Sequence, residues 1–356
     1  MTTGTGVIGF GFMGRTHAAA FESARRAGYD CELRGIADAH DPSLAPDSAT
    51  MPSRGISPAN SGSPPAINPT ASNGNLIPAA SGSDFESVRR YADAAALLAD
   101  PTIDIVSICT PTDTHVDLAI KALAAGKHVI VEKPVALDLA SIERLADAAE
   151  QSGKVCLPAM CMRWWPGWSW LRDHIFSRTF GSVKAARFER LGPVPGWSSF
   201  YRNASRSGSA LFDLHVHDAD FVRWCFGEPA AVTSVGERTH LSTFYHYGNG
   251  PAHVVAEGGW LAEAGVPFTM RYRVEFERAV VEFDLAADPT IRVAQGGSLS
   301  PVEFPPETAY ELQVRHALDL VLGRKRPLAT VRDALKTTTL LHAELKSLGS
   351  RSRVTL

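Results

Sequence analysis

The chain has 356 residues, more than one typical domain, so two domains are expected. Its 35 lysines and arginines nearly balance 38 aspartates and glutamates, which excludes the basic footprint of a nucleic-acid-binding protein. No apolar run approaches the roughly 18 residues of a transmembrane helix, and the first predicted strand leaves no room for a signal peptide. The five cysteines include no C-x-x-C pair, so we expect reduced thiols in a cytoplasmic protein, without disulfides or a zinc site.

The chain begins with a short apolar strand that leads into a glycine-rich turn. Gly9, Gly11 and Gly14 have the G-x-G-x-x-G spacing of dinucleotide-binding folds. There the first glycine permits a tight turn, the second lets the backbone approach a pyrophosphate, and the third lets the next helix pack close to the strand. The pyrophosphate would lie at the helix N-terminus, where free N–H groups favour negative charge. Glycine clusters also form ordinary turns, but in a dinucleotide-binding domain Phe12 and Met13 would join the glycines at the cofactor.

A helix over Arg15–Ala27 and a strand over Cys31–Asp38 are predicted next. Asp38 ends the strand 24 residues after Gly14, close to where an acidic residue binds the adenine ribose hydroxyls. A carboxylate there repels the 2′-phosphate of NADP, and no arginine follows immediately to receive that phosphate. The sequence therefore predicts NAD as cofactor, with NADP the weaker alternative. A plain strand-end turn is the other interpretation of Asp38.

Residues 41–83 differ sharply in composition from the rest of the chain. They include eight prolines, nine serines and four glycines, but only three charged residues. Such a segment cannot bury enough apolar surface to offset its ordering entropy. We interpret it as a low-complexity surface insertion in the nucleotide-binding domain, tolerated because closure entropy rises slowly with loop length.

Helices and strands alternate again from this insertion to residue 158. Helices are predicted over Asp84–Leu98, His115–Ala125 and Leu139–Gln151, and strands over Ile103–Cys109, His128–Val131 and Val155–Pro158. Strands separated by helices of about 10–15 residues are typical of right-handed βαβ units. Residues 1–158 are therefore predicted to form an NAD(P)-binding Rossmann domain of the α/β class, with a doubly wound parallel sheet.

From residue 159 the pattern becomes that of an α+β domain. Predicted strands include Val183–Leu191, Ala252–Leu261, Phe268–Phe276 and Ala279–Leu285, and predicted helices cover Ser209–Phe226, Thr308–Leu322 and Val331–Leu348. Alternation of polar and apolar residues, as in Tyr272–Phe276, indicates strands with one buried face. We expect residues 159–356 to form a large, open, mostly antiparallel sheet that supplies the substrate-binding and oligomerisation surfaces.

Two sequence clusters carry the residues best suited to chemistry. Lys133 follows a predicted parallel strand, at the edge where open α/β sheets place their ligands, and Pro134 keeps the chain there out of helical geometry. A lysine in that crevice can bind a substrate hydroxyl and stabilise a developing alkoxide during hydride transfer. Asp213 and His217 are spaced i and i+4, so on one helix face the carboxylate would orient the imidazole that takes the alcohol proton. A surface lysine and a surface ion pair are the alternative interpretations.

The chain resembles the Gfo/Idh/MocA oxidoreductase family, which includes glucose–fructose oxidoreductase and inositol dehydrogenase. The resemblance rests on the glycine turn and on Thr110–His115, Ala125–Pro134 and Gly208–Asp218, and it covers nearly the whole chain except residues 41–83. It implies that Lys133, Asp213 and His217 match the family's catalytic lysine, aspartate and histidine. It also implies a place near the ribose and nicotinamide for further residues: Thr110, Pro111, His115, Glu132 and Lys133.

The second predicted domain contains two segments suited to holding a polyol. Arg163 and Trp165 belong to an aromatic stretch whose donors and rings can bind a sugar, although at least two of its tryptophans are expected in the core. The loop Gly192–Ser207, which includes Trp197 and Tyr201, is predicted to set substrate selectivity; a plain connecting loop is the alternative. Arg163, Trp165 and Tyr201 thus join the lysine, aspartate and histidine in the predicted substrate site.

His215 departs from the family pattern, because many members carry glycine at this position. It creates the sequence His-x-His-Asp, which could indicate a metal site. Residues two apart on a helix face different sides, however, so we predict no metal ligands. We expect His215 to contact the substrate or the domain interface.

The sequence thus predicts an NAD(P)-dependent oxidoreductase acting on the CH–OH group of a sugar, cyclitol or related polyol. As in the family, a homodimer or homotetramer through the exposed sheet face is expected, with neither nucleic acid nor membrane as partner. Two alternatives remain open: a glycosidase that uses NAD transiently, as members of the family do, and a non-catalytic sensor of dinucleotide and sugar. Such sensors tend to lose the lysine or the histidine, so Lys133 and His217 argue against a sensor.

Overall fold

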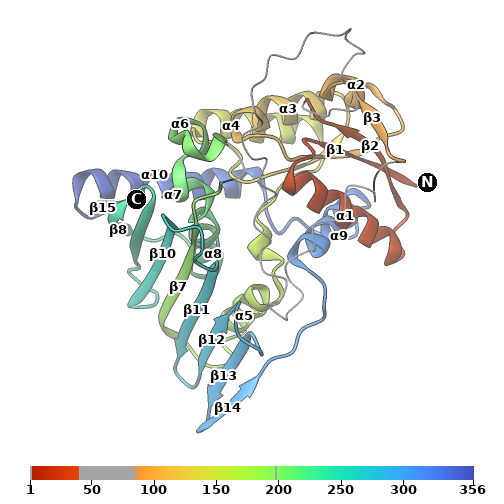
Figure 1. Ribbon diagram of the computed structural model, residues 1–356. Coiled ribbons are helices and arrows are strands. Elements are labelled where there is room, and N and C mark those ends of the chain that lie inside the picture. Colours follow the sequence, from red (N-terminus) through yellow and green to blue (C-terminus); the bar gives the residue numbers. More distant parts are fainter. Residues whose placement is uncertain (1, 40–84, 86, 197–198) are drawn as a thin grey trace.

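The structure is a computed structural model that describes residues 2–39, 85, 87–196 and 199–356. The predicted insertion over residues 41–83, Asp84 at the start of a predicted helix, and Trp197 lie outside the described residues. Two sheets with helices packed against them form most of the molecule (Figure 1). The predicted fold class, a Rossmann sheet followed by a mostly antiparallel sheet, is confirmed.

The first sheet contains six parallel strands: β1 (Thr3–Ile8), β2 (Cys31–Ala37), β3 (Arg89–Tyr91), β4 (Ile105–Ile108), β5 (His128–Val131) and β6 (Cys156–Pro158). Their spatial order, β3-β2-β1-β4-β5-β6, is that of doubly wound dinucleotide-binding sheets. The chain reverses its direction across the sheet between β1 and β4. The carboxyl ends of these two strands therefore frame the crevice where such sheets bind ligands.

Helices cover both faces of this first sheet (Figure 1). On one face lie α1 (Phe12–Arg26) and α9 (Ala309–Val321), and on the other lie α2 (Ala94–Ala99), α3 (Thr112–Ala124) and α4 (Leu139–Ser152). Helix α9 comes from the C-terminal part of the chain and contributes Val314, Ala317 and Leu318 to the core of the first sheet. A boundary at residue 158 therefore does not fully separate the two cores.

One predicted helix, Asp84–Leu98, is wrong over most of its length. Its middle forms the edge strand β3, because Arg89–Tyr91 pair in parallel with Gly35–Ala37 of β2. The helix α2 begins only at Ala94, where the Asp93 carboxylate accepts a hydrogen bond from the backbone N–H of Ala96. A three-residue strand at a sheet edge is too short to leave a periodic signal in the sequence.

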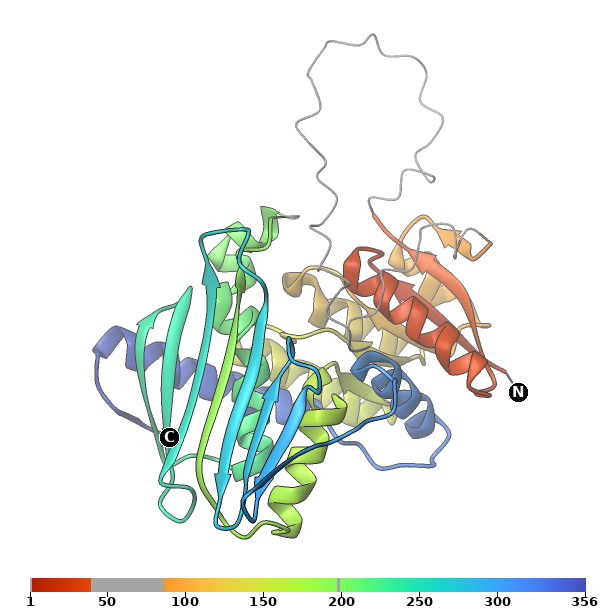
Figure 2. The same ribbon diagram turned by 60° about the horizontal axis from the view of Figure 1, so that its bottom comes forward.

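The second sheet has nine strands: β7 (Val183–Pro193), β8 (Ala231–Glu237), β9 (His240–His246), β10 (His253–Leu261), β11 (Thr269–Phe276), β12 (Val280–Asp284), β13 (Ile291–Gln295), β14 (Ser298–Pro301) and β15 (Val354–Thr355). Only β7 and β10 pair in parallel among the described strands of this sheet. On β11, Tyr272 and Val274 are buried whereas Arg271 and Arg273 are exposed. Figure 2 shows the resulting open face, with α8 (Val216–Phe226) and α10 (Val331–Ser350) behind the sheet.

Between β6 and β7 lie η3 (Cys161–Arg163) and α5 (Pro166–Ser177), and between β7 and α8 lie η4 (Ser199–Arg202), α6 (Ala204–Ser207) and α7 (Ser209–Asp213). The continuous helix predicted over Ser209–Phe226 is wrong, because it breaks into α7 and α8. The N–H groups of Leu214 and His215 both donate to the carbonyl oxygen of Ala210, at 2.9 and 2.8 Å, so a wide turn ends α7. Asp213 and His217 therefore do not share one regular helix face.

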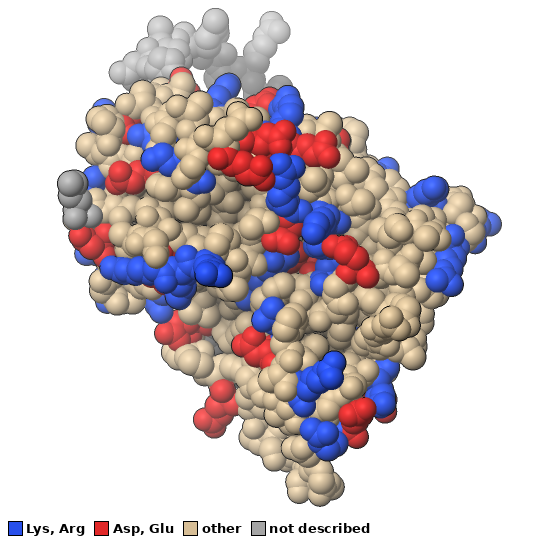
Figure 3. Space-filling model, turned by 180° about the vertical axis from the view of Figure 1, so that it is seen from behind, with Lys and Arg blue, Asp and Glu red and all other residues tan. Residues whose placement is uncertain are grey.

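The surface carries charges of both signs. Figure 3 shows acidic and basic side chains interspersed over one face of the molecule, as the near-neutral composition requires. Among the described residues, no helix has the length and apolar character needed to cross a membrane.

Candidate active site

The glycine turn after β1 has the backbone geometry expected from its spacing. Gly9 has a φ of +86°, which favours glycine, and its N–H donates to the carbonyl oxygen of Ala37 at 2.8 Å. A Cβ on Gly14 would lie 2.0 Å from the carbonyl oxygen of Gly9, so α1 can pack this close to the turn only with glycine there. A Cβ on Gly11, the residue that caps α1, would meet nothing within 4 Å. The turn therefore presents an open backbone surface at the N-terminus of α1.

Asp38 lies beside this turn, directly after β2. Its Oδ2 accepts a hydrogen bond of 2.6 Å from the backbone N–H of Phe10. Phe12, at the start of α1, exposes 44% of its surface, and Met13 is half-buried. The acidic residue and the start of α1 thus border the same open turn.

Glu132, which the sequence places near the cofactor, links α1 to the end of β5. It is buried, its Oε1 lies 3.0 Å from Nε2 of His17 on α1, and its Oε2 accepts the backbone N–H of Lys133 at 3.1 Å. Burial acts to lower the pKa of His17, but the neighbouring Cys109 and Glu132 raise it to about 10. The opposite charges of this buried pair tie α1 to the end of β5.

Sequence reasoning missed His17, which is fully buried and lies 3.1 Å from Ser107 Oγ through Nδ1. The available signal was a polar residue on the buried face of α1.

His115 also links loops and is buried away from solvent. Its ring nitrogens lie 2.7 Å from the carbonyl oxygen of Thr110 and 3.0 Å from that of Pro134. The loops after β4 and β5 are thereby held together, with Thr110 half-buried and Pro111 exposed at the edge of the crevice. Of the residues predicted near the nicotinamide, Thr110 and Pro111 remain positioned to touch a ligand, whereas His115 supports them.

The structure brings Lys133 and Asp213 together at the end of β5. Lys133 Nζ donates to Asp213 Oδ1 at 2.9 Å and to the Asp213 carbonyl oxygen at 2.7 Å. Both side chains are about one-sixth exposed, at 17% and 16%. Burial acts to lower the pKa of Lys133, but the Asp213 carboxylate together with Tyr201 and Glu132 holds that pKa above its ordinary value. Tyr201 lies close enough to Lys133 to contribute to this effect.

His217 stands in the first turn of α8, beside the same cluster. Burial, together with the positive charges of Lys133 and Arg190, lowers the pKa of His217 well below its ordinary value. Its Nδ1 lies 3.9 Å from Sγ of Cys161. The expected hydrogen bond between the His217 ring and the Asp213 carboxylate does not form, because the helix break turns the carboxylate toward Lys133. The site thus combines a charged lysine with a neutral histidine.

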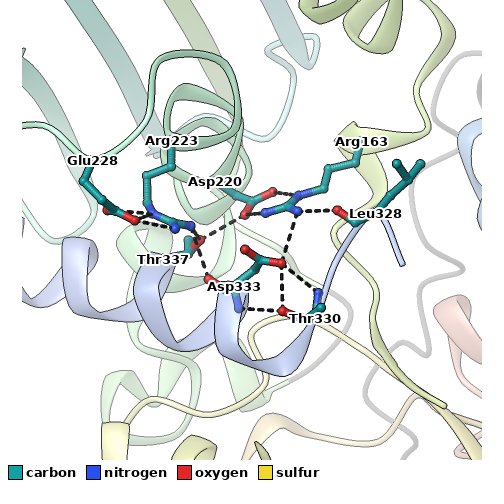
Figure 4. A network of polar contacts seen from close by, with 8 residues as sticks. All are labelled: Arg163, Asp220, Arg223, Glu228, Leu328, Thr330, Asp333 and Thr337. Carbon is teal, nitrogen blue, oxygen red and sulfur yellow. Dashed lines mark hydrogen bonds and ion pairs between the residues drawn. The ribbon is translucent and has the colours of Figure 1, made fainter. Parts of the chain in front are cut away.

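Arg163 and Trp165, which the sequence places in the substrate site, are buried in the protein interior. Arg163 is 3% exposed, and its Nε and Nη2 donate to the two carboxylate oxygens of Asp220 at 2.9 and 2.7 Å. Figure 4 shows this pair with Leu328, whose carbonyl oxygen accepts from Nη1 of Arg163. Trp165 is 4% exposed and belongs to the core of the second sheet. In the structure both side chains are thus engaged inside the protein, and their predicted contact with substrate stays a prediction.

His215 is likewise internal and contacts no open surface. Its Nε2 lies 3.0 Å from Glu344 on α10 and 3.2 Å from the Tyr245 hydroxyl. A Cβ on Gly258 would lie 2.7 Å from His215 Nδ1, so the ring occupies the space that this glycine leaves. In the described part of the chain, no group of three or more His, Cys, Asp or Glu residues is arranged to hold a metal ion.

Two family models match the chain. One, described as "Oxidoreductase family, NAD-binding Rossmann fold", matches residues 72–160, and the GFO/IDH/MocA C-terminal domain matches residues 168–285. The chain belongs to the Gfo/Idh/MocA family. The resemblance inferred from the motifs is confirmed, and the NAD-binding Rossmann domain of this oxidoreductase family agrees with the predicted cofactor.

Relatives within the Gfo/Idh/MocA family align over part or most of the chain. The uncharacterized oxidoreductase ORF334 of Rhizobium meliloti is 37% identical over 152 residues, which are 42% of this chain and 45% of that protein. The chain thus spans less than half the length of the first curated relatives it matches. The scyllo-inositol 2-dehydrogenase (NAD(+)) of Bacillus subtilis is 26% identical over 258 residues, 68% of this chain and 74% of that protein.

A solved structure with the same fold is that of levoglucosan dehydrogenase in complex with NADH and levoglucosan. It matches with a TM-score of 0.79 and 20% identity, covering 100% of this chain and 99% of that chain. At this identity the likeness establishes the two-domain fold.

Proposed function

We propose that this protein is an NAD-dependent dehydrogenase that transfers a hydride between the nicotinamide and a hydroxyl-bearing carbon of a sugar, cyclitol or related polyol. The observation that carries the proposal is that a charged Lys133 and a neutral His217 lie in one cluster at the carboxyl edge of the Rossmann sheet. The relatives named for inositol and levoglucosan oxidation support this substrate class.

The glycine turn and its surroundings fit an NAD molecule. The open backbone at Gly11 and the N-terminus of α1 suit a pyrophosphate, and the Asp38 carboxylate beside the turn suits ribose hydroxyls. Thr110 and Pro111 border the inner end of the crevice. When bound, NAD supplies an acceptor for the hydride of the alcohol carbon.

Lys133 holds the reacting oxygen of the substrate. A lysine ammonium has three N–H groups, and two of those on Lys133 donate to Asp213. The third can donate to the substrate hydroxyl and stabilise the alkoxide that develops on it. Because Asp213 keeps the pKa of Lys133 raised, the ammonium remains charged throughout the ordinary pH range.

His217 takes the proton of the substrate hydroxyl. A general base must be uncharged before the reaction, and the lowered pKa of His217 keeps the imidazole neutral at pH 7. Tyr201, in η4 before α7, would contact the remainder of the polyol. In the reverse direction the imidazolium returns the proton.

We further propose that the unit formed by residues 159–356 binds the substrate and joins copies of the chain. The open face of the second sheet carries Arg187, Arg271 and Arg273 among acidic neighbours, which suits self-complementary ion pairing. The five free cysteines suit a reducing, cytoplasmic location. The molar mass from size-exclusion chromatography with light-scattering detection, measured at low and high salt, tests for a homodimer or homotetramer.

Absorbance of the reduced nicotinamide tests the proposed reaction. Sugars, cyclitols and sugar acids are screened with NAD and then with NADP, using the native chain and Lys133→Ala. Sustained reduction with one substrate, absent in Lys133→Ala, is the expected result. Release of nitrophenol from a nitrophenyl glycoside without net reduction would replace the dehydrogenase with a glycosidase. Tight dinucleotide binding without either reaction would favour a sensor.

A further inference from the structure

The ring of His217 has an unusual neighbour for a catalytic imidazole. Among the described residues its hydrogen-bond partner is the sulfur of Cys161, 3.9 Å from Nδ1. The nearby carboxylate of Asp213 is bonded to Lys133 instead. Nε2 of His217 has no partner in the part of the chain that the structure describes, and His217 is half-buried, so this nitrogen is left for a ligand.

Cys161 is held rigidly against α8 by the residue two positions later in η3. Arg163 forms a bidentate ion pair with Asp220. Asp220 lies three residues after His217 and thus on the same side of α8. As Figure 4 shows, the arginine is fixed further by the segment that leads into α10. Tyr310 also lies close to the Cys161 thiol. These contacts fix the position of the Cys161 sulfur relative to the His217 imidazole.

The hydrogen bond at one ring nitrogen decides which tautomer a neutral histidine adopts. We propose that Cys161 is the positioning residue of His217: its sulfur accepts the Nδ1–H hydrogen bond, which leaves the Nε2 lone pair for the substrate proton. The proton of the substrate hydroxyl then moves to Nε2 while its O–H bond breaks. This assignment rests on the proposed function of the same site.

A thiol suits this role because it orients the ring without adding charge. Burial raises the pKa of Cys161 to about 12, so the group stays a neutral thiol. A carboxylate at the same position would stabilise the imidazolium and raise the pKa of His217. With Cys161 the ring is oriented, while burial and the two nearby cations, Lys133 and Arg190, keep it unprotonated.

The first measurement is the tautomer of His217 in the substrate-free protein, from long-range proton–nitrogen correlation spectra of ¹⁵N-histidine-labelled chain. Spectra of His217→Asn assign the signal. We expect the Nδ1–H form in the native chain and a shift toward the Nε2–H form in Cys161→Ala. An Nε2–H form in the native chain would overturn the proposal, whatever the activity. An Nδ1–H form in a chain that oxidises no polyol would refute the proposed function and leave the role of Cys161 intact.

Kinetics supply the second measurement once a substrate is known. Cys161→Ala should lower kcat about tenfold, the effect of losing one ordinary hydrogen bond, with little change in KM. Cys161→Ser, which keeps a hydrogen-bonding atom, should recover most of that loss. Cys225→Ala is the matched control, because Cys225 is buried in the same core but its sulfur is not paired with the His217 ring. An unchanged kcat in Cys161→Ala, or equal losses in Cys161→Ala and Cys225→Ala, would contradict the proposal.

Discussion

Replacing Asp213 with asparagine tests the pairing on which the proposed chemistry depends. Asp213→Asn keeps the size of the side chain and the backbone carbonyl that accepts one Lys133 N–H, but removes the carboxylate 2.9 Å from Nζ. Breaking a buried ion pair costs about 3–5 kcal/mol, which the one-sixth exposure of this pair reduces to roughly 2–3 kcal/mol. Since one pKa unit corresponds to about 1.4 kcal/mol, the pKa of Lys133 should fall by about two units.

The sign of this shift determines the pH profile. Lys133 must be protonated to stabilise an alkoxide, so activity is lost as the pH rises through its pKa. In the native chain that pKa lies above 10.5, and no alkaline limb from Lys133 is expected below it. In Asp213→Asn the alkaline limb of kcat/KM should therefore lie about two pH units below the pKa that Lys133 has in the native chain. Asp117→Asn is the control, because Asp117 pairs with Arg144 on the surface and is 71% exposed. An Asp213→Asn profile that coincides with the native one would refute the assignment of Asp213 to Lys133.

Three further predictions concern the cofactor domain. Gly11→Ala should have the same unfolding temperature as the native chain but bind NAD at least about tenfold more weakly, as measured by calorimetry. Gly14→Ala should lower the unfolding temperature, because its Cβ has no space. Equal effects of the two variants would contradict this division. His17→Leu should lower the unfolding free energy by about 3 kcal/mol at pH 7, since it leaves Glu132 buried without its partner. Because the pKa of His17 is raised from 6.5 to about 10, its contribution to the unfolding free energy is complete below pH 6.5 and is lost toward pH 10. The unfolding free energy measured in urea should therefore depend more steeply on pH in the native chain than in His17→Leu. Asp38→Ala should reduce the preference for NAD over NADP about tenfold, measured as the ratio of kcat/KM values; an unchanged ratio would remove Asp38 from the ribose site.

The sequence predicted those features that depend on local backbone rules. Gly9 and Gly14 are required by a positive φ and a close helix approach, and both constraints belong to a turn of six residues. The parallel strands were visible because buried strands read as short apolar runs between helices. The site residue Lys133 could be placed for the same reason, since it follows such a strand at the carboxyl edge.

The features that the sequence did not reveal depend on partners far along the chain. Arg163 pairs with Asp220, 57 residues away, and nothing in its aromatic surroundings indicates a structural rather than a substrate-binding arginine. The break between α7 and α8 accompanies the burial of His215 against Glu344, 129 residues later, while the helical periodicity of Ser209–Phe226 continues across the break. Such contacts become visible only when the second sheet and α10 are packed together.

The break between α7 and α8 has a chemical consequence for the motif D-x-x-x-H. On a continuous helix the Asp213 carboxylate would bond to His217 and favour its protonated form, which cannot accept a proton from an alcohol. The break directs the carboxylate to Lys133, where it stabilises the ammonium that the alkoxide requires. His217 is left with a thiol neighbour, and burial together with the positive charges of Lys133 and Arg190 keeps its imidazole neutral. The break thus leaves the Asp213 carboxylate with Lys133, while burial and two cations keep His217 neutral. The proposed removal of a proton and a hydride from one alcohol uses both protonation states.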